Sequence, residues 1–324
     1  MPREIVHIKI ANTVFNQLAN DDFWRLSEEY LEFVRLGSVF HDSLYYHPTS
    51  GPSYQEVVSI PDQLHGEKGE DTHDLVRKIS QVAFSDYQIA QNSAVRHFLL
   101  GIIAHIHTDA TFHPMIYYYT GNCYNQDPLK RSIAIQEHRR LESLIDLFFL
   151  DDDVKLSSFH IKNSLGHPLL KDVLQIVANL IEIGLDPQQL YHALDRSYQQ
   201  YGKFQSLYTK STVRRLFYLG AKLTNKSFLK EAHALFYDRS RLIELQRRQS
   251  KLEYLHPVTG DRHLTDLNTL YNASEQSVLS ICQTVEQHVT AGTIEQLAVG
   301  PSLEVALPQG LASEMKYFAK TSLV

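Results

Sequence analysis

The chain has 324 residues, of which 43% are hydrophobic and 21% are charged, and its formal net charge is −6. This is the composition of an ordinary globular protein, long enough for one large or two medium domains. The negative charge and the lack of a long basic block argue against a broad cationic face that would grip nucleic acid.

Cysteine and histidine are the informative residue types. The two cysteines, Cys123 and Cys282, lie far apart, which excludes a cysteine zinc cluster and a disulfide framework but leaves a single bridge open. The chain contains 17 histidines, and imidazole is the commonest metal ligand near neutral pH. The composition therefore favours a metal site without locating it.

No targeting or membrane segment stands out. The first ten residues place two charges before a short mixed stretch, without the apolar run of a secretory signal. The most apolar runs, at residues 97–105 and 174–185, are too short to span a bilayer. We expect a cytoplasmic protein by default, with export by a signal-independent route left open.

The long segments predict helices. Their apolar residues recur at steps of three and four, whereas strand-like alternation is scarce. In chain order these segments are 89–106, 131–150, 168–184, 188–200, 211–223, 227–249 and 267–291. Breaks are expected at residues 163–166, 201–203 and 256–260, which contain glycine or proline. None of the breaks has the composition of a flexible linker, so we predict a single all-α domain over residues 1–324, with residues 151–324 completing a helix bundle.

Two loops in the first third carry potential ligands at helix edges. Asp42 lies in the segment 36–43, just before Pro48 and Gly51, and His65 lies in the segment 64–72. A rigid helical scaffold commonly presents its chemistry at such positions.

Three polar residues follow these loops at one-turn spacing. His105, Asp109 and His113 lie four residues apart, so on a helix they form one inclined stripe. His107 falls on roughly the opposite face, about 200° away. Pro114 disfavours helical geometry at the residue before it, which predicts that His113 sits at a helix end and turns toward a second ion.

A second pair of potential ligands has the same one-turn spacing. His138 and Glu142 are again four residues apart. Two helices that each offer an imidazole and a carboxylate could face one another around metals, and this ligand set suits zinc and also iron or manganese. The alternative is structural: a buried His donates to a nearby carboxylate, or Glu142 pairs with Arg139 on a solvated face. Each pair alone is common by chance, but their combination with His113, Asp42 and His65 favours metal binding.

The ordered motifs resemble the zinc-dependent phospholipase C family, including the amino-terminal domain of glycosylphosphatidylinositol-specific phospholipase D, and more remotely the zinc-dependent single-strand nucleases. The resemblance covers roughly residues 1–150. Segments 302–308 and 255–260 are only loosely similar to the carboxy-terminal part of small bacterial members. The motifs that carry the resemblance are residues 2–7, 36–42 and 97–114, followed by His138 and Glu142.

The resemblance implies an all-α fold with a multinuclear metal cleft holding two or three zinc ions. Asp42, His65, His105 and Asp109 would form one site, with His73 as the second choice for the loop ligand. The other two sites would use His113, His138 and Glu142, and His7 with Asp109. Asp42 and Asp109 would be the catalytic carboxylates, with Asp109 bridging. The chain begins Met-Pro, whereas the secreted phospholipases have an amino-terminal Trp at the third site.

These features predict a metal-dependent phosphodiesterase that hydrolyses a phospholipid headgroup ester through a metal-activated hydroxide. The substrate would be a phospholipid or another phosphodiester, with transient contact to a membrane surface and no stable nucleic-acid binding; protein partners are unknown. The aromatic segments 45–46 and 117–119 would line a groove or pack in the core.

Three rival functions remain. One is a nuclease-like specificity on the same metals. Another is an HD-type phosphohydrolase, in which His41 and Asp42 would both bind the metal. The last is a non-catalytic helical protein in which the metal only stabilises the fold or an interaction surface.

Overall fold

The computed structural model describes residues 3–48, 54–85, 90–182 and 184–323. As predicted, this part of the chain is mostly helical; its sheet structure is one antiparallel hairpin. The strands are β1 (Leu252–Leu255) and β2 (Arg262–Thr265). The α-helices are α1 (Glu4–Leu18), α2 (Leu31–Gly37), α3 (Phe40–Ser43), α4 (Tyr54–Val58), α5 (Ile60–Leu64), α6 (Asp74–Ala83), α7 (Ala90–Thr120), α8 (Pro128–Phe149), α9 (Leu170–Leu180), α10 (Pro187–Tyr208), α11 (Ser211–Thr224), α12 (Ser227–His233), α13 (Leu242–Arg248) and α14 (Leu267–Thr290).

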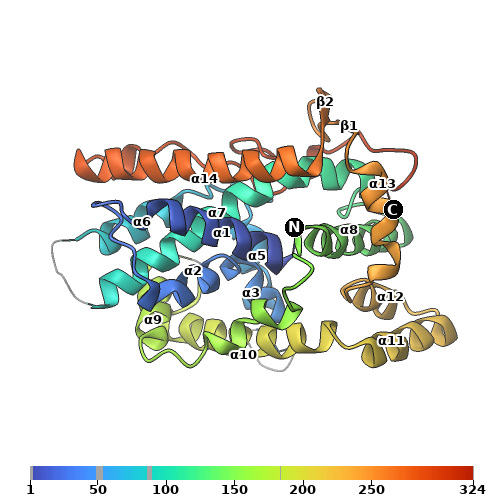
Figure 1. The fold of residues 1–324 in the computed structure, drawn as a ribbon, viewed down its shortest axis with the longest axis horizontal. Coiled ribbons are helices and arrows are strands. Elements are labelled where there is room, and N and C mark those ends of the chain that lie inside the picture. Colours follow the sequence, from blue (N-terminus) through green and yellow to red (C-terminus); the bar gives the residue numbers. More distant parts are fainter. Residues whose placement is uncertain (1–2, 49–53, 86–89, 183, 324) are drawn as a thin grey trace.

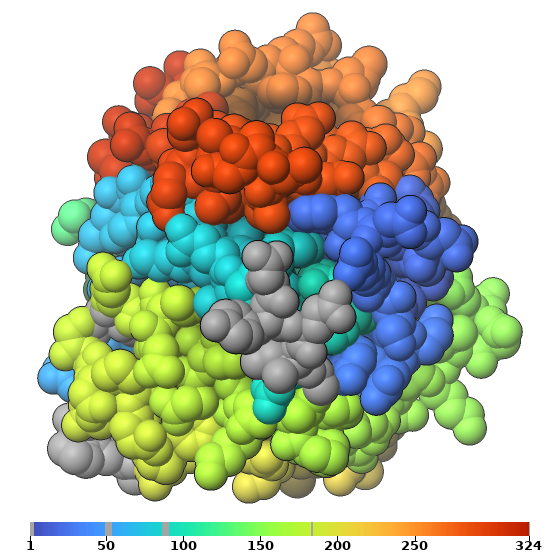
Figure 2. All heavy atoms as spheres, turned by 90° about the vertical axis from the view of Figure 1, so that its left-hand side faces the viewer, coloured from blue at the N-terminus to red at the C-terminus, as the bar shows by residue number. Residues whose placement is uncertain are grey.

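Helix α7 is the spine of the fold. It has 31 residues, which corresponds to a length of about 46 Å. It contacts α1, α2, α6, α8 and α14. Figure 1 shows α14 running along one long side of the molecule and α10 along the other, with α1, α2 and α7 between them. Figure 2 shows the same order from one end, with the red α14 above the blue and cyan segments and the yellow-green α9–α10 region below.

A close contact between two glycines sets the distance between α2 and α7. A Cβ atom on Gly37 would lie 2.1 Å from the carbonyl oxygen of Phe98, and one on Gly101 would lie 2.2 Å from that of Val34. No larger residue fits at either position unless the backbone moves. This approach brings the end of α2 against the polar stripe of α7, together with the short helix α3, which carries Asp42 where the sequence predicted a loop.

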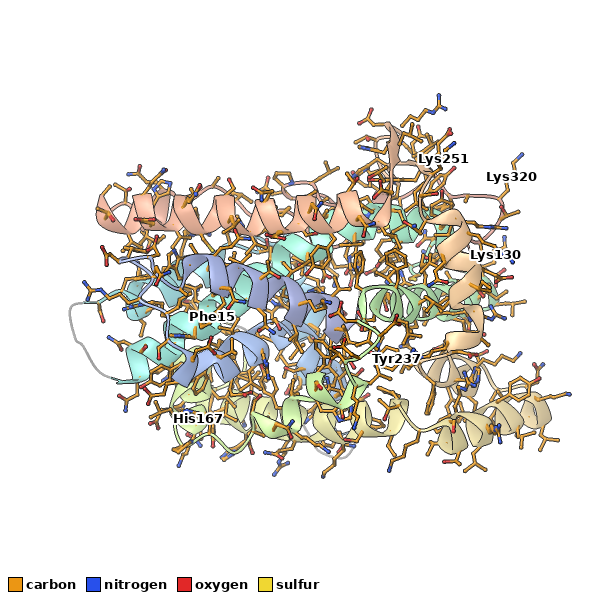
Figure 3. All side chains as sticks on the ribbon, in the orientation of Figure 1. Phe15, Lys130, His167, Tyr237, Lys251 and Lys320 are labelled. Carbon is orange, nitrogen blue, oxygen red and sulfur yellow. The ribbon has the colours of Figure 1, made fainter. Side chains whose placement is uncertain are left out.

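The hydrophobic core is closed to solvent. Phe15, Phe33, Phe98 and Phe112 are at most 2% exposed. Figure 3 shows Phe15 inside the bundle, whereas Lys130, Lys251 and Lys320 lie at the periphery. Among the described helices, none combines the length and apolarity needed to cross a bilayer. Cys123 and Cys282 are both free thiols, so the single bridge that the sequence left open does not form.

The predicted helix end at His113 is wrong. Helix α7 continues through Pro114 to Thr120. The proline lacks the N–H that would bond to the carbonyl of Ala110, but its neighbours Phe112, Met115 and Ile116 are fully buried. Their burial outweighs the loss of one helical hydrogen bond.

The predicted break at residues 201–203 is also wrong, because α10 runs through them to Tyr208. Gly202 serves close packing: a Cβ atom there would lie 3.4 Å from the Cβ of Lys162.

The prediction of a single helix over 227–249 is wrong as well, because this segment forms two helices, α12 and α13. The chain leaves the helix where the backbone N–H of Tyr237 donates to the carbonyl of Tyr208. The predicted break at 256–260 is confirmed, and it forms the turn of the β1–β2 hairpin. The hairpin itself was not predicted from the sequence. The single-domain boundary of 1–324 stays a prediction.

Candidate metal centre

The predicted ligands gather into three groups within the described residues. Each group contains ligand atoms that all lie within 4.8 Å of one another. The groups are His7 with His105 and Asp109, Asp42 with His65 and His105, and His113 with His138 and Glu142. Because His105 belongs to two of them, we call the first two together the central set and the third the outer set.

Asp109 lies at the middle of the central set. Its Oδ1 is 3.0 Å from Nε2 of His7, and its Oδ2 is 3.1 Å from Nε2 of His105. Nε2 of His65 lies 3.9 Å from the same Oδ2. The carboxyl group is fully buried, so one carboxylate faces three imidazoles without access to solvent.

Backbone carbonyl groups fix the orientation of the histidines. Nδ1–H of His105 donates to the carbonyl of Ser38 (2.9 Å) and that of His65 to Pro61 (2.6 Å). In the outer set, Nδ1–H of His113 donates to Leu303 (2.5 Å). A hydrogen bond from one ring nitrogen leaves the lone pair of the other for a metal, as is usual for metal-binding histidines.

The resulting contacts between lone pairs require a cation or a proton. With its Nδ1 proton committed to Ser38, a neutral His105 presents the Nε2 lone pair to a carboxylate oxygen of Asp109. Nε2 of His105, both oxygens of Asp109 and Nε2 of His113 make no hydrogen bond of ordinary geometry within the described part of the chain. Buried polar atoms are rarely left without partners, so this donor set fits one or more cations.

The electrostatics favour the ligand forms of most of these groups. Burial lowers the pKa of His7, His113 and His138, which keeps the imidazoles neutral at pH 7. Burial raises the pKa of Asp109, but His105 and His7 more than offset this and hold it well below its usual range. His65 differs: burial lowers its pKa, but the hydrogen bond and charge of Asp42 raise it to about 9. The place between His65 and Asp42 therefore attracts a proton or a metal cation.

Four helices and one loop supply the ligands. His7 is on α1, and the backbone N–H groups of Ile5 and Val6 both donate to Asp146 of α8, at 3.1 Å. This carboxylate caps the first turn of α1, which has no cap of its own. The ring of His7 stacks on that of His105, with 4.3 Å between centroids. In the outer set, Nε2 of His138 and Oε1 of Glu142 are 2.8 Å apart on α8.

The other histidines of the predicted motifs lie elsewhere. His107 and His73 contact each other, with 3.2 Å between their Nε2 atoms, and His107 also meets Ser277. His73 is therefore separate from Asp42, and it is His65 that the fold brings to that residue. His41 stacks on His105 at 4.7 Å between centroids but belongs to none of the three ligand groups.

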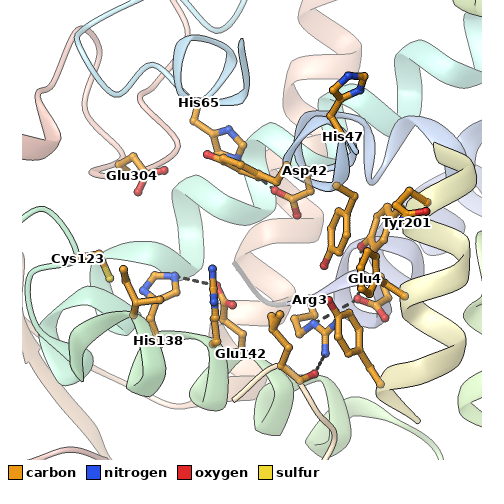
Figure 4. Close-up of a pocket in the computed structure, with 18 of the residues that line it drawn as sticks. Arg3, Glu4, Asp42, His47, His65, Cys123, His138, Glu142, Tyr201 and Glu304 are labelled. Atoms are coloured by element: carbon orange, nitrogen blue, oxygen red, sulfur yellow. Dashed lines mark hydrogen bonds and ion pairs between the residues drawn. The ribbon is translucent and has the colours of Figure 1, made fainter. Parts of the chain in front are cut away.

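A pocket of about 600 Å³ opens onto both sets. Figure 4 shows Asp42 and His65 on one side, His138 and Glu142 on another, and Arg3, Glu4 and Tyr201 on a third. Tyr45, Tyr46 and Tyr117 of the predicted aromatic segments line it. By contrast, Tyr118 and Tyr119 pack near the β1 strand, where the Tyr119 hydroxyl donates to the carbonyl of Glu253.

Two pocket residues carry no predicted role. The Arg3 guanidinium is 5% exposed and is held over the rings of Tyr208 and Tyr237, at 4.6 and 4.9 Å. Its Nη1 donates to Leu235, but its Nη2 has no hydrogen-bond partner among the described residues. Glu304 accepts a hydrogen bond from Tyr117, and burial raises its pKa although His65 and Tyr117 lower it. Arg3 lies within a motif of the resemblance, and Glu304 lies in the loosely similar segment 302–308.

The segment before Glu304 joins the two sets. The backbone N–H of Leu303 donates to the carbonyl of His65 (2.8 Å), and its own carbonyl accepts from His113 (2.5 Å). One peptide segment from the carboxy-terminal region thus holds a histidine of each set.

Comparison with known proteins agrees with this chemistry. A family model for zinc-dependent phospholipase C matches residues 6–185, which is more than half of the chain. No curated protein and no solved structure gave a significant match. The match spans every ligand of both sets, and family membership supports a metal-dependent, phospholipase-type function. The chain is a member of the zinc-dependent phospholipase C family.

Proposed function

We propose that this protein hydrolyses the headgroup phosphodiester of a phospholipid in the pocket of about 600 Å³. The observation that carries the proposal is that ligands of two different sets, Asp42 and His65 from one and His113, His138 and Glu142 from the other, line the same pocket. A phosphodiester there would meet both sets at once.

The residues present suit two or three zinc ions. The central set would hold ions between His7, Asp42, His65, His105 and Asp109, with Asp109 shared, and the outer set would hold one with His113, His138 and Glu142. Bound zinc supplies Lewis acidity toward phosphoryl oxygens and a hydroxide nucleophile near neutral pH. Asp42 and Asp109 are the carboxylates that would orient the reacting groups, and their charge offsets that of the cations.

Arg3 would bind the substrate phosphate. Its Nη2, which has no hydrogen-bond partner among the residues that the structure describes, belongs to a side chain that lines the pocket. The two tyrosine rings and Glu4 restrict the motion of this side chain. A guanidinium held in this way loses little conformational entropy when it donates to a phosphoryl oxygen. Glu304 would donate a proton to the leaving alkoxide, since it lines the pocket and burial raises the pKa of its carboxyl group.

The aromatic wall would exclude water from the reaction. The rings of Tyr46 and Tyr201 stack at 4.3 Å, and Phe204 and Tyr208 continue the same wall. Such a surface suits the apolar parts of a lipid better than the evenly charged backbone of a nucleic acid.

Turnover of a short-chain phosphatidylcholine below its micellar concentration tests the proposal. We expect release of the phosphorylated headgroup by zinc-loaded protein, loss after chelation, and recovery on adding zinc back. The Glu304→Gln variant should keep its zinc content and lose activity by about 100-fold. Single-stranded DNA turned over faster than the lipid would replace the proposal with a nuclease function. A chelated protein that unfolds, with no activity on either substrate when loaded, would favour a purely structural metal.

A further inference from the structure

Helices α11 and α12 form an excursion at one end of the molecule. The chain leaves α10 after Tyr208 and returns at Tyr237, whose N–H closes the excursion on the carbonyl of Tyr208. Figure 1 shows α11 and α12 at the end opposite the α6 and α9 region. Both helices lie outside residues 6–185, which the family model matches.

The outer face of this excursion is apolar. Leu216, Leu219 and Leu223 lie three and four residues apart on α11, so they share one face of the helix. They are 67%, 51% and 84% exposed, and Phe228 at the start of α12 is 61% exposed. The opposite side of α11 faces inward, with Phe217 against Phe236 and Gly220 against Leu229. Exposed apolar side chains gathered on one element mark an interaction site.

Positive charge surrounds these side chains. Residues 210–248 contain ten Lys and Arg and three Asp and Glu, a net charge of +7. Since the whole chain carries −6, the rest of it carries −13. Arg215 and Lys222 are exposed on α11, and Lys226 lies 6.0 Å from the ring of Phe228. None of these three cations forms an ion pair within the described ranges.

A second cavity, of about 270 Å³, lies beside the apolar face. Its lining includes Tyr218, which is 52% exposed, and four arginines and one histidine. These are Arg140, Arg214, Arg215, Arg241 and His233. Arg140 pairs with Glu137 and Arg214 with Asp238, whereas Arg215 and Arg241 make no ion pair among the described residues. Two guanidinium groups therefore remain available to an anion.

We propose that this face docks on a bilayer containing anionic phospholipids. The leucines and Phe228 would enter the boundary between headgroups and acyl chains, and the arginine cavity would bind the phosphate of one lipid. An amphipathic surface with Lys and Arg beside Leu and Phe is the usual design for such binding. A second copy is the poorer occupant because two faces of net charge +7 would repel, and nucleic acid would leave the leucines in water.

Docking would place the active-site pocket near lipid. Tyr208 and Leu235, at the two ends of the excursion, both line the pocket of about 600 Å³. This consequence rests on the proposed function, but the binding itself does not depend on catalysis.

Vesicle co-sedimentation tests the proposal. We expect binding to phosphatidylcholine vesicles that contain about one-third phosphatidylglycerol, weaker binding at high salt, and little binding to pure phosphatidylcholine. The Leu223→Asp variant should bind at least about tenfold more weakly. The Arg215→Glu variant should also bind about tenfold more weakly. Leu264→Asp is the matched control, because Leu264 is 76% exposed on β2, away from the excursion.

Three results would overturn docking: no binding of the unmodified protein to the anionic vesicles, equal losses in Leu223→Asp and Leu264→Asp, or a dimer by light scattering that Leu223→Asp dissociates. Turnover of the monomeric short-chain lipid is measured in parallel. Unchanged turnover in Leu223→Asp with lost vesicle binding separates docking from catalysis. If the unmodified protein binds vesicles without turnover, the proposed function fails and docking stands.

Discussion

The central and outer sets use similar ligands in different surroundings. Every side chain of the central set except Asp42 is at most 1% exposed, and its ligands come from α1, α3, the loop after α5, and α7. In the outer set His138 and Glu142 are 12% and 8% exposed, and both come from α8. Asp42, at 12%, is the central ligand that reaches the pocket wall with His65.

The different origins of the ligands in the chain indicate which set stabilises the fold. Ligands from distant parts of the chain become close only when the protein is folded, so a cation among them adds to the free energy of unfolding. Two of the three outer ligands lie one turn apart on α8, so a cation in the outer set joins only α7 and α8. We therefore expect metal at the central set to stabilise the protein strongly, and metal at the outer set to act mainly in the reaction.

The largest effect is expected for Asp109→Ala. Removing the shared carboxylate leaves the central cations without the negative charge that offsets them, and breaking such a buried arrangement costs about 3–5 kcal/mol. Elemental analysis should show loss of the central zinc, with a lower melting temperature and no lipid turnover. Asp151→Ala is the control, since this carboxylate pairs with Lys9 at the surface. Zinc content unchanged from wild type would contradict the central role of Asp109.

Glu142→Ala should separate the sets. We expect loss of one zinc per chain and a fall in lipid turnover of about 100-fold or more. The melting temperature should change by only a few degrees, because the side chain lies at the pocket wall. Glu137→Ala, on the same helix, is the matched control. A collapse in stability as large as that of Asp109→Ala would erase the distinction between the sets.

His41→Ala tests the rival in which His41 and Asp42 bind metal together. The ring of His41 packs on His105 and is buried, so its removal leaves a cavity and should cost about 1–3 kcal/mol. Zinc content should be retained, whereas His65→Ala should lose central zinc. Equal zinc loss in both variants would favour the HD-type site.

Asp146 connects the two sets, because it lies on α8 and caps α1, the helix that carries His7. Burial raises the pKa of Asp146 to about 7, with Glu4 adding to the shift. The folded state therefore holds its proton more tightly, and the stability this provides is present in acid and lost as the pH rises through 7. Relative to Asp146→Asn, the wild type should lose on the order of 2 kcal/mol between pH 5 and pH 8.

Chemical denaturation of both proteins at the two pH values measures this difference. Taking the difference between the two proteins removes the pH dependence of all the titratable groups that they share. A constant difference across the range would show that Asp146 keeps an ordinary pKa, held down by the N–H groups of Ile5 and Val6.

The sequence predicted the helices and the one-turn ligand pairs because both depend on local spacing. His105 with Asp109, and His138 with Glu142, follow from steps of four residues on a helix. Asp42 and His65 could be named only as potential ligands from their positions, and their grouping with Asp109, like the role of His7, required the family resemblance.

The unpredicted features are long-range contacts. The hydrogen bond from His113 to Leu303 spans 190 residues, and that from Arg3 to Leu235 spans 232. Tertiary burial also decided against local signals at Pro114 and Gly202, where the sequence predicted helix ends. The spacing of residues along the sequence describes one helix at a time, so it cannot predict a hydrogen-bond or packing partner that another helix supplies.

The hydrogen bonds that Leu303 makes to His65 and His113 also affect the order in which the site can form during synthesis. A ribosome adds roughly 5–20 residues per second, so about 10–40 s separate the synthesis of His113 from that of its acceptor. Once His138 and Glu142 have been added, early in this interval, the nascent chain contains every proposed zinc ligand, but the segment that orients His65 and His113 does not yet exist. The proposed active site would thus remain unfinished until the segment around Leu303 has been made, which would delay reactivity toward lipid until that segment packs against His65 and His113.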